Sequence, residues 1–577
     1  MESSPVLAAL DLVKTFGQTR ALDGISFAIR QGAVTGLIGP DGAGKTTLMR
    51  LAAGLLVPDS GSIRALGLDS THDSLAVQAA LGYMPQRFGL YEDLTVQENL
   101  DLYADLQGVP KAERAERYAE LTHMTGLSPF AARLAGKLSG GMKQKLGLAC
   151  TLVRAPSLLL LDEPTVGVDP VSRRELWAII NRLVHDRGMS VLLSTAYLDE
   201  AERCQEVVLM HQGKILMHGA PAELSAPMAG RTWTVTAPGR KLRDLQAELA
   251  EQDSVVDALV HGDHVRVVTK QISSRQELLE LPALADTQIQ SVPPRFEDGF
   301  IDLLRKRTNT AGSRQTTPKK STAHQDDAPV ISVSGLKRRF GDFYAVDGIS
   351  FEVNRGEIFG LLGANGAGKS TTFRMLCGLL PASAGSLQVA GLDLRYAAST
   401  ARARIGYMSQ KFSLYGSLSV AQNLAFFAST YGLSGSARQQ RLDWALSEFE
   451  LAEHAGLLSA DLSLGHKQRL AMACALMHSP EILFLDEPTS GVDPLARREF
   501  WQRISALSRS GVTILVTTHF MEEAEYCDRL AIMASGRILA MDEPATIKAR
   551  IRTADNPEPS MEDAFISLVE GYAREDA

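Results

Sequence analysis

The sequence has few cysteines, few aromatic side chains and no long hydrophobic run. Its five cysteines are scattered over 577 residues and none forms a CxxC pair, so neither a metal site nor a disulfide framework is expected. Cys150 and Cys474 stand in similar sequence surroundings, and we expect them to be small buried packing residues. No segment approaches the ~18 consecutive apolar residues that a membrane-spanning helix requires. The beginning, MESSPVLAALDLVK, lacks the basic-then-apolar order of a secretory signal, and we expect a cytoplasmic protein.

An excess of positive charge is also missing. The chain has 67 acidic against 59 basic side chains and a net charge of −8, which argues against a general nucleic-acid binder. Its composition, 45% hydrophobic and 22% charged, is that of a globular protein. A chain of this length is too long for one ordinary core, so two or more domains are expected.

The sequence contains one long internal repeat. GLIGPDGAGKTTLMRLAAGLL returns as GLLGANGAGKSTTFRMLCGLL, and the offset between the copies stays at 324 residues through most of the match. The matched segments are 36–56 with 360–380, 81–100 with 405–424, and 159–170 with 483–494. A repeat of this length is far too long for a solenoid, so we interpret it as a tandem duplication of a whole domain.

Each copy alternates short apolar runs with helical stretches. Continuous apolar strands separated by helices predict an α/β fold with a mostly parallel sheet. The predicted buried strands are 33–39, 158–162 and 191–195 in the first copy, and 357–363, 482–486 and 513–518 in the second.

The segments outside the copies differ in character. TWTVTA and HVRVVT alternate like strands, and KLRDLQAELAEQ and SRQELLEL are helical, so residues 226–304 predict a small α/β appendage. The polar stretch 305–328 predicts a flexible linker. PRFEDGFIDLL near the end of the first half returns as PSMEDAFISLV near the end of the second. The predicted domains are 1–225, 226–304, 305–328, 329–545 and a helical tail, 546–577.

Both copies carry GxxxxGK[ST] after an apolar strand, as GPDGAGKT (39–46) and GANGAGKS (363–370). Glycines allow backbone N–H groups to surround phosphate oxygens, and the lysine reaches the terminal phosphates. Two matches at equivalent repeat positions leave little room for chance. The phosphate-binding candidates are Gly39, Gly42, Gly44, Lys45, Thr46 and Thr47 in the first copy, and Gly363, Gly366, Gly368, Lys369, Ser370 and Thr371 in the second.

A second motif, LDEP, ends a buried strand in each copy. Asp162 and Asp486 are candidate Mg²⁺ ligands together with the hydroxyls of Thr46 and Ser370. The next residues, Glu163 and Glu487, are candidates to orient or deprotonate an attacking water. Alone, such a motif could equally be a solvated acidic turn, but it follows a phosphate loop in both copies.

A third motif, LSGGMKQKL (138–146), opens a helix with a serine and two glycines. Its counterpart, LSLGHKQRL (462–470), has Leu464 in place of the first glycine. A glycine-rich helix start alone is usually only a helix cap. The residues proposed to bind phosphate here are Ser139, Gly140, Gly141, Ser463 and Gly465.

Together these motifs resemble the nucleotide-binding domain of ATP-binding-cassette (ABC) proteins. The resemblance covers residues ~6–225 and ~330–545, hereafter the first and second cassette. It implies a RecA-like core with a helical subdomain in each cassette, and ATP and Mg²⁺ as ligands. In that family, two cassettes close head to tail, so that each ATP lies between one phosphate loop and the opposite LSGG signature.

The resemblance also implies roles for further residues. Gln86 and Gln410 would sense the γ-phosphate, contribute to the Mg²⁺ site and contact the transport subunits. Phe16 and Phe340, each 29 residues before the phosphate-loop lysine, would stack on adenine; each could otherwise be an ordinary surface or core residue. Asp169 and Asp493 match the loop that links the two sites.

One position breaks the symmetry. STAYLDEAERC (194–204) matches TTHFMEEAEYC (517–527), but Ala196 stands where the second cassette has His519. The resemblance implies that His519 is the switch histidine that contacts the γ-phosphate. Head-to-tail pairing would gather Ala196 and Leu464 into the site built on Lys45, so we expect this site to be degenerate. The site with Lys369, Glu487, His519 and the opposite Ser139 is expected to hydrolyse ATP.

The sequence also narrows the type of transporter. GLYEDLTVQENL and the PxxEDxF echo resemble ATPases of bacterial exporters of the daunorubicin-resistance type. The expected partners are two membrane permease subunits, which need not be identical, with no nucleic acid, and the expected location is the inner face of the cytoplasmic membrane. Two alternatives stay open: a tandem-cassette translation or ribosome factor, which usually has a charged helical linker, and a fused sugar-importer ATPase, whose second phosphate loop is commonly degenerate.

Overall fold

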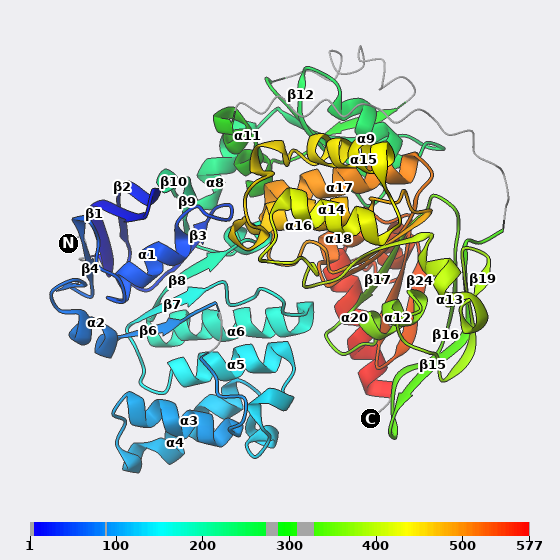
Figure 1. Ribbon diagram of the computed structural model, residues 1–577. Helices are drawn as coiled ribbons and strands as arrows, with labels where there is room; N and C mark the ends of the chain where they lie inside the picture. Colours follow the sequence, from blue (N-terminus) through cyan, green and yellow to red (C-terminus); the bar gives the residue numbers. More distant parts are fainter. Residues whose placement is uncertain (1–4, 87–88, 273–286, 309–327, 555, 576–577) are drawn as a thin grey trace. The chain divides into compact units, whose positions relative to one another are not determined.

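The computed structural model describes residues 5–86, 89–272, 287–308, 328–554 and 556–575 (Figure 1). The chain forms two compact units. One contains residues 1–230 and 293–308, and the other contains residues 231–292 and 309–577. Most of the predicted flexible linker and the predicted helical patch SRQELLEL lie outside the described residues.

The central sheet of the first unit has six strands. Its order is β10 (Lys214–Gly219), β9 (Glu206–His211), β3 (Val34–Ile38), β8 (Ser190–Thr195), β7 (Leu158–Asp162) and β6 (Leu81–Met84). All neighbours are parallel except β9 and β10. Strands β3, β7 and β8 are buried along their whole length, as expected for a parallel sheet covered on both faces.

The second unit repeats this sheet. Its order is β20 (Ile405–Met408), β21 (Ile482–Asp486), β22 (Thr513–Thr518), β17 (Ile358–Gly363), β23 (Arg529–Ala534) and β24 (Arg537–Asp542). Again only the last pair is antiparallel. The prediction of two α/β nucleotide-binding folds in one chain is therefore confirmed.

A smaller antiparallel sheet accompanies each central sheet. In the first unit its order is β2 (Thr19–Ile29), β1 (Leu7–Phe16), β4 (Ser60–Ala65) and β5 (Leu68–Asp69). In the second unit it is β16 (Phe343–Val353), β15 (Ile331–Phe340), β18 (Ala384–Val389) and β19 (Leu392–Asp393). One hydrophobic core joins this sheet to the central one in each unit. The ends of β1 and β15 carry Phe16 and Phe340 to the surface.

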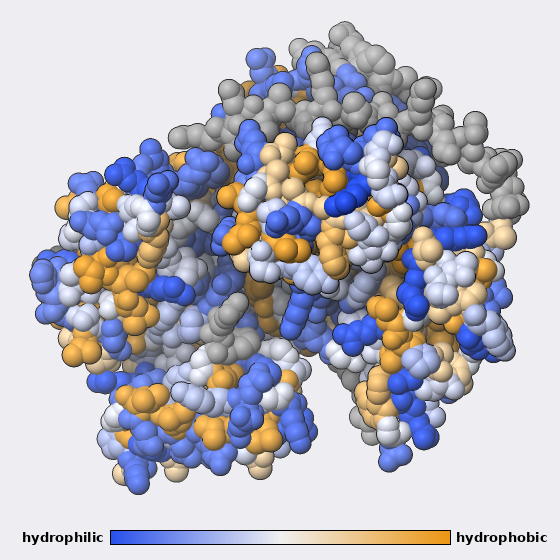
Figure 2. Space-filling view, viewed as in Figure 1, coloured by the Kyte–Doolittle hydropathy of each residue, from blue (hydrophilic) through white to orange (hydrophobic). Residues whose placement is uncertain are grey.

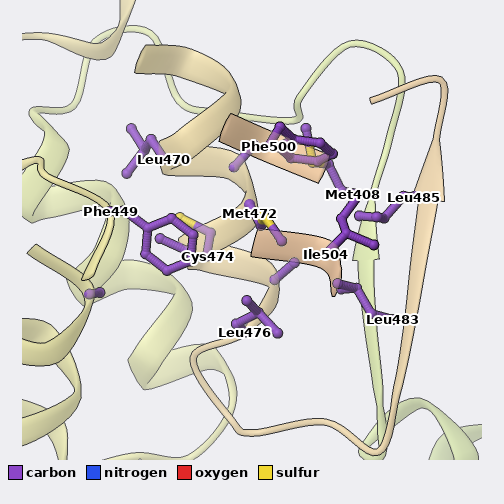
Figure 3. Close-up of a cluster of buried hydrophobic side chains, with 14 of the residues drawn as sticks. Met408, Phe449, Leu470, Met472, Cys474, Leu476, Leu483, Leu485, Phe500 and Ile504 are labelled. Carbon is purple, nitrogen blue, oxygen red and sulfur yellow. The ribbon is translucent and has the colours of Figure 1, made fainter. Parts of the chain in front are cut away.

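Helices cover the central sheet of each unit. Those that contact its strands are α5 (Gly140–Thr151), α6 (Pro170–Arg187), α16 (Leu464–Ala475) and α17 (Pro494–Arg509). Helices α3 (Val96–Leu106) and α14 (Val420–Thr430) pack on α5 and α16, and α4 (Lys111–Met124) and α15 (Gly435–Glu448) accompany them. In the second unit, Met472 and Cys474 of α16 and Phe500 and Ile504 of α17 meet sheet residues in one buried cluster (Figure 3). All five cysteines are buried, which agrees with their predicted packing role.

Within the described residues 231–272 and 287–292, the appendage between the cassettes is a four-stranded antiparallel sheet with the helix α9 (Leu242–Ala250). The strand order is β12 (Val255–His261), β13 (His264–Thr269), β11 (Thr232–Thr236) and β14 (Gln288–Ser291). These elements, called the accessory domain below, belong to the second unit although they follow the first cassette in sequence.

The two PxxEDxF segments begin helices that return to their own cassettes. Helix α11 (Phe296–Thr308) packs on α7 (Leu198–Glu202) and α8 (Pro221–Ser225), and the backbone N–H of Phe296 donates to the Glu202 carboxylate at 2.9 Å. Helix α20 (Met561–Glu575) packs on α18 (Met521–Ala524) and α19 (Pro544–Ala549). The echo therefore marks the same structural element in both halves.

The visible surface mixes hydrophobic and hydrophilic side chains (Figure 2). Large exposed hydrophobic residues include Leu75, Leu106 and Tyr396. Among the described residues, no helix has the length and apolar character needed to cross a membrane.

Candidate nucleotide-binding sites

The first phosphate loop joins β3 to α1 (Lys45–Ala52). Gly44 has φ 102°, and a Cβ at this position would lie 2.5 Å from the Ala21 carbonyl oxygen. A Cβ at Gly39 would lie 2.2 Å from the Met210 carbonyl oxygen. Only glycine fits at both positions, because the backbone passes too close to its neighbours for any side chain.

The two phosphate-loop lysines are buried and held in the same way. Lys45 Nζ donates to the Gly39 carbonyl at 2.8 Å, and Lys369 Nζ donates to the Gly363 carbonyl at 2.6 Å. Only 5% of Lys45 and 4% of Lys369 is exposed. A buried ammonium in a glycine-rich loop that leads into a helix N-terminus suits a polyphosphate.

The second loop has the same glycine geometry before α12 (Lys369–Leu376). Gly368 also has φ 102°, and a Cβ would lie 2.5 Å from the Ala345 carbonyl oxygen. Gly42 and Gly366 both have positive φ, 75° and 86°. The half-buried Thr47 and Thr371 lie in the first turn of the helices.

A hydroxyl and a carboxylate meet beside each loop. Thr46 Oγ1 donates to Asp162 Oδ1 at 3.2 Å, and Ser370 Oγ donates to Asp486 Oδ1 at 3.3 Å. Both aspartates are buried, and Asp162 Oδ2 has no hydrogen-bond partner among the described residues. Oxygen donors of this kind are those that Mg²⁺ prefers, and a buried carboxylate oxygen without a partner fits a cation or its bound water.

The glutamates that follow have unusual backbone conformations. Glu163 has φ 51° and Glu487 has φ 47°, in the left-handed region that non-glycine residues seldom occupy. Each backbone N–H is anchored at 2.9 Å, by Ser194 Oγ in the first cassette and by Thr517 Oγ1 in the second. Strain of this kind concentrates at functional sites.

Glu487 lies among several positively polarised groups. Its carboxylate is 3.2 Å from His519 Nδ1 and 3.7 Å from Lys369 Nζ, and it accepts a 2.8 Å hydrogen bond from Gln410 Nε2. Burial acts to raise the pKa of Glu487, but His519, Lys369 and Gln410 outweigh it and lower the pKa to about 2. The carboxylate is therefore ionised at neutral pH.

Glu163 has the same neighbours except the histidine. It accepts from Gln86 Nε2 at 2.5 Å and is 3.9 Å from Lys45 Nζ. Burial raises the pKa of Glu163, and Lys45 compensates only in part. The buried Ala196, at the position of His519, offers no polar group. One side chain thus separates two otherwise equivalent carboxylates.

The aromatic residue after this position is shared by both cassettes. The Arg173 guanidinium lies 5.3 Å from the Tyr197 ring centroid, and the Arg497 guanidinium lies 4.5 Å from that of Phe520. Tyr197 therefore has the same structural place as Phe520.

The two LSGG-type segments differ in more than one residue. In the first, Ser139 caps α5, and Gly141 is obligatory because a Cβ would lie 2.3 Å from Ser172 Oγ. In the second, Ser463 caps α16, and its hydroxyl also lies 2.7 Å from His466 Nδ1. Gly140 and Leu464 are the first residues of these two helices.

The remaining predicted residues are placed alike in both cassettes. Phe16 and Phe340 are each 48% exposed, and each has a cation near its ring. An exposed aromatic ring at the end of a strand is suited to stacking on a base. Asp169 and Asp493 are the N-caps of α6 and α17, so their carboxylates orient the start of these helices.

The sequence reasoning missed a second layer of side chains. Thr195 Oγ1 donates to the buried Glu200 at 2.6 Å, and Thr518 Oγ1 donates to the buried Glu523 at 2.7 Å. The hydroxyls of Ser194 and Thr517 also donate to Asp162 Oδ1 and Asp486 Oδ1, at 2.7 and 2.6 Å. The repeat itself carried the signal, because all these hydroxyls and acids stand at equivalent positions.

Comparison with known proteins gives relatives along nearly the whole chain. A family model described as "ABC transporter" matches residues 22–166 and 346–490. The Escherichia coli (strain K12) protein YbhF, named as a probable multidrug ABC transporter ATP-binding protein, is 51% identical over 95% of this chain and 94% of its own. The Nod factor export ATP-binding protein I of Ralstonia nicotianae is 44% identical over 37% of this chain and 68% of its own. A solved ATP-binding subunit of an ABC transporter is 30% identical, with TM-score 0.38, over 42% of this chain and 99% of its own.

Proposed function

Because the chain belongs to the ABC transporter family, with one ATP-binding cassette in each half, we propose that it drives multidrug export by separate permease subunits and that its cassettes do unequal work. Members of the family are ATPases, so the reaction is ATP hydrolysis coupled to transport. The export assignment is supported by the name of the relative that shares 51% of its residues along 95% of this chain.

The proposal of unequal cassettes depends on the surroundings of one carboxylate. Glu487 is kept ionised beside His519 and Gln410, so it suits a group that orients the attacking water and takes up its proton. His519 Nε2 is buried and has no hydrogen-bond partner among the described residues. We assign it to the γ-phosphate, where it would stabilise developing charge.

The first cassette keeps the groups that bind nucleotide. Lys45 is held as Lys369 is held, and Thr46 meets Asp162 as Ser370 meets Asp486. These hydroxyl–carboxylate pairs would hold Mg²⁺, with Gln86 and Gln410 nearby, and bound Mg²⁺ supplies charge neutralisation at the β- and γ-phosphates. The first cassette is therefore assigned to ATP binding with little turnover.

Closure is proposed to follow the head-to-tail pattern of the family. The ATP held by Lys369 would then meet Ser139 and its two glycines, whereas the ATP held by Lys45 would meet Ser463 and Leu464. Both departures, Ala196 and Leu464, would act on the same nucleotide. Fusion in one chain gives the second cassette a high effective concentration for this closure.

The proposed partners of the chain are membrane permease subunits, through which the exported compound would pass. We propose one chain for each pair of permease subunits at the inner face of the cytoplasmic membrane, and the unequal cassettes favour two different permeases. The net charge of −8 and the intact GANGAGKS loop argue against a ribosome factor and a sugar-importer ATPase. A sedimentation experiment distinguishes the exporter subunit from a ribosome factor: the tagged chain should sediment with membranes and not with ribosomes.

The test of the unequal cassettes is vanadate trapping with photoreactive azido-ATP on the full chain. Labelled peptides are then assigned to a cassette by mass spectrometry. We expect vanadate-dependent label on the second cassette, because trapping requires turnover. Equal vanadate-dependent labelling of both cassettes would contradict the proposal.

A further inference from the structure

We propose that the accessory domain is an intramolecular clamp for the second cassette, which positions the segment that carries and follows His519. The inference rests on the proposed function, in which the second cassette hydrolyses ATP. Asp257 and Arg243 are the positioning residues, and neither lies in the nucleotide site. Their contacts join the accessory domain to α17 and to residues 526–528, which flank the segment of His519 in the fold.

A buried ion pair forms the centre of the contact. Asp257 of β12 pairs with the guanidinium of Arg498 on α17, and only 6% of each residue is exposed. Two charges removed from water are tolerated only when they meet each other. Separating the accessory domain from α17 would leave both groups without this partner, so the pair ties the two surfaces together.

Arg243 makes the second polar contact. Its Nη1 donates to Ser508 Oγ at 2.6 Å and to Asp528 Oδ2 at 2.9 Å. The same Asp528 oxygen accepts from the backbone N–H of Ile358 at 2.9 Å. Ile358 begins β17, the strand that runs into the second phosphate loop. Arg243 therefore binds a carboxylate that already organises the start of this strand.

An aromatic contact completes the surface. Tyr526 packs against the hydrophobic core of the accessory domain. Its ring stacks on the indole of Trp501, with centroids 4.8 Å apart and an interplanar angle of 15°. At the turn between β12 and β13, a Cβ at Gly262 would lie 2.7 Å from Lys548 Nζ, which pairs with Glu525. The contact thus continues along residues 525–528.

The first cassette shares only part of the chemistry of this surface, because Arg498 has a counterpart in Arg174 but the other polar residues differ. The counterparts of Ser508, Asp528 and Tyr526 are Val184, Gln205 and Arg203. An arginine such as Arg243 would there find neither a hydroxyl nor a carboxylate, and a second cation would replace the tyrosine ring. The accessory domain follows the first cassette in sequence, yet the hydroxyl and carboxylate that bind Arg243, and the tyrosine ring, are found only in the second.

The contact connects to the nucleotide site through α17 and α18. Arg497, the neighbour of Arg498, covers the Phe520 ring and lies 3.8 Å from Glu523. Glu523 holds Thr518, the residue before His519. The accessory domain holds α17 at Arg498, and it holds the chain after His519 at Tyr526 and Asp528. These contacts therefore limit the movement of the short segment that carries His519.

The test compares hydrogen–deuterium exchange and ATP turnover in variants of the full chain. Asp257→Arg places two cations together, and we expect exchange in residues 519–530 to rise ~10-fold or more, because a buried charge without its partner is strongly destabilising. We expect kcat to fall several-fold while KM for ATP changes less than ~2-fold, since ground-state binding groups are untouched. Asp257→Arg combined with Arg498→Asp restores the pair and should recover both measurements.

Two further variants make the test specific. Arg243→Gln keeps most of the side chain and should give a smaller change in the same direction. Asp253→Arg adds the same charge at an exposed position of the accessory domain and should change neither measurement. Unchanged exchange in residues 519–530 on both Asp257→Arg and Arg243→Gln would overturn the inference.

A control separates failure of the inference from failure of the proposed function. If exchange rises but turnover does not change, and Glu487→Gln still abolishes turnover, the accessory domain does not position the site and the inference is wrong. If Glu487→Gln itself leaves turnover intact, the assignment of hydrolysis to the second cassette is wrong. The second outcome also overturns the inference, because the clamp would then act on a cassette that does not turn over.

Discussion

The two cassettes have the same fold and differ in the surroundings of one buried glutamate. In both, a buried lysine donates to the carbonyl of the first glycine of the phosphate loop. In both, the glutamate of the LDEP motif has a left-handed backbone conformation. His519 is 3.2 Å from Glu487, whereas Ala196 leaves Glu163 without such a neighbour. The pKa of Glu487 is lowered to about 2, and that of Glu163 is raised. The imidazole of His519 thus helps to lower the pKa of the neighbouring glutamate, while the fold around the two glutamates is the same.

The proposed division of work assigns binding and turnover to different side chains. The groups proposed to contact nucleotide in its ground state, namely the glycines, lysines, hydroxyls and carboxylates, are present in both cassettes. The differences fall on the histidine and the signature helix. A site with the first set alone is expected to hold ATP, since preorganised donors at the developing charge govern the rate of the chemical step.

The largest effect is expected from removing the two glutamates in turn. Glu487→Gln should lower ATP turnover of the full chain ~10²–10³-fold, because a neutral amide cannot take up the proton of water. Glu163→Gln is the matched control and should reduce turnover less than ~2-fold. Steady-state ATPase assays measure both, and equal losses would break the comparison.

The next effect concerns the histidine. His519→Ala should lower turnover ~10²-fold, the lower end of the range for removing one positioned donor. The reciprocal change, Ala196→His, is measured in the Glu487→Gln background, where only the first site can act. We expect turnover to rise there, by less than the loss at the second site, because an imidazole must be accommodated at a buried position. No rise would show that the histidine alone does not distinguish the sites.

A smaller and symmetric effect is expected at the adenine. Phe340→Ala and Phe16→Ala should each weaken ATP binding to their own cassette ~5–10-fold, which is the lower part of the range for base–aromatic stacking. Fluorescent-nucleotide titration measures the affinities. Similar losses would sharpen the conclusion that the cassettes are alike in binding; a loss at one cassette only would contradict it.

The smallest effect is expected at the second signature. Leu464→Gly should raise the residual turnover of the Glu487→Gln chain ~2–5-fold, because it restores the backbone freedom found at Gly140. Leu464 is the first residue of α16, so the change should cost less stability than a glycine in a helix interior, which costs about 0.5–1 kcal/mol, and the melting temperature is measured alongside. Turnover that stays level or falls would mean that Leu464 is not what limits this site.

Much of the fold could be predicted because it follows local patterns. GPDGAGKT and GANGAGKS predict a strand, a tight turn and a helix. The turn requires glycine at Gly39 and Gly44, because any side chain there would collide with neighbouring backbone, and glycine can be recognised in the sequence. The apolar runs ending in LD predict buried strands at 158–162 and 482–486, and these are the observed bounds. Such features depend on a few adjacent residues, so the sequence alone determines them.

The sites were predicted less completely. The hydroxyl–aspartate pairs join residues 116 positions apart, and they could be anticipated only because their motifs are distinctive. Ser194 and Thr517 carry no such motif, and their role depends on strands that become neighbours in the sheet. Tyr197 shows the same limit. The sequence shows only that it follows Ala196, whereas the fold places its ring against Arg173 as the ring of Phe520 lies against Arg497.

The sequence by itself determined that this protein has two ATP-binding cassettes, and it located the position where they differ. This was possible because glycine, lysine and acidic residues at these fixed spacings are compatible with few local structures. Only the tertiary structure decided how the histidine acts on Glu487 and which cassette receives the accessory domain. Shifts of pKa and the complementarity of two surfaces depend on distances and on burial. Residues such as Arg243 and Asp528 come close together only when the chain is folded.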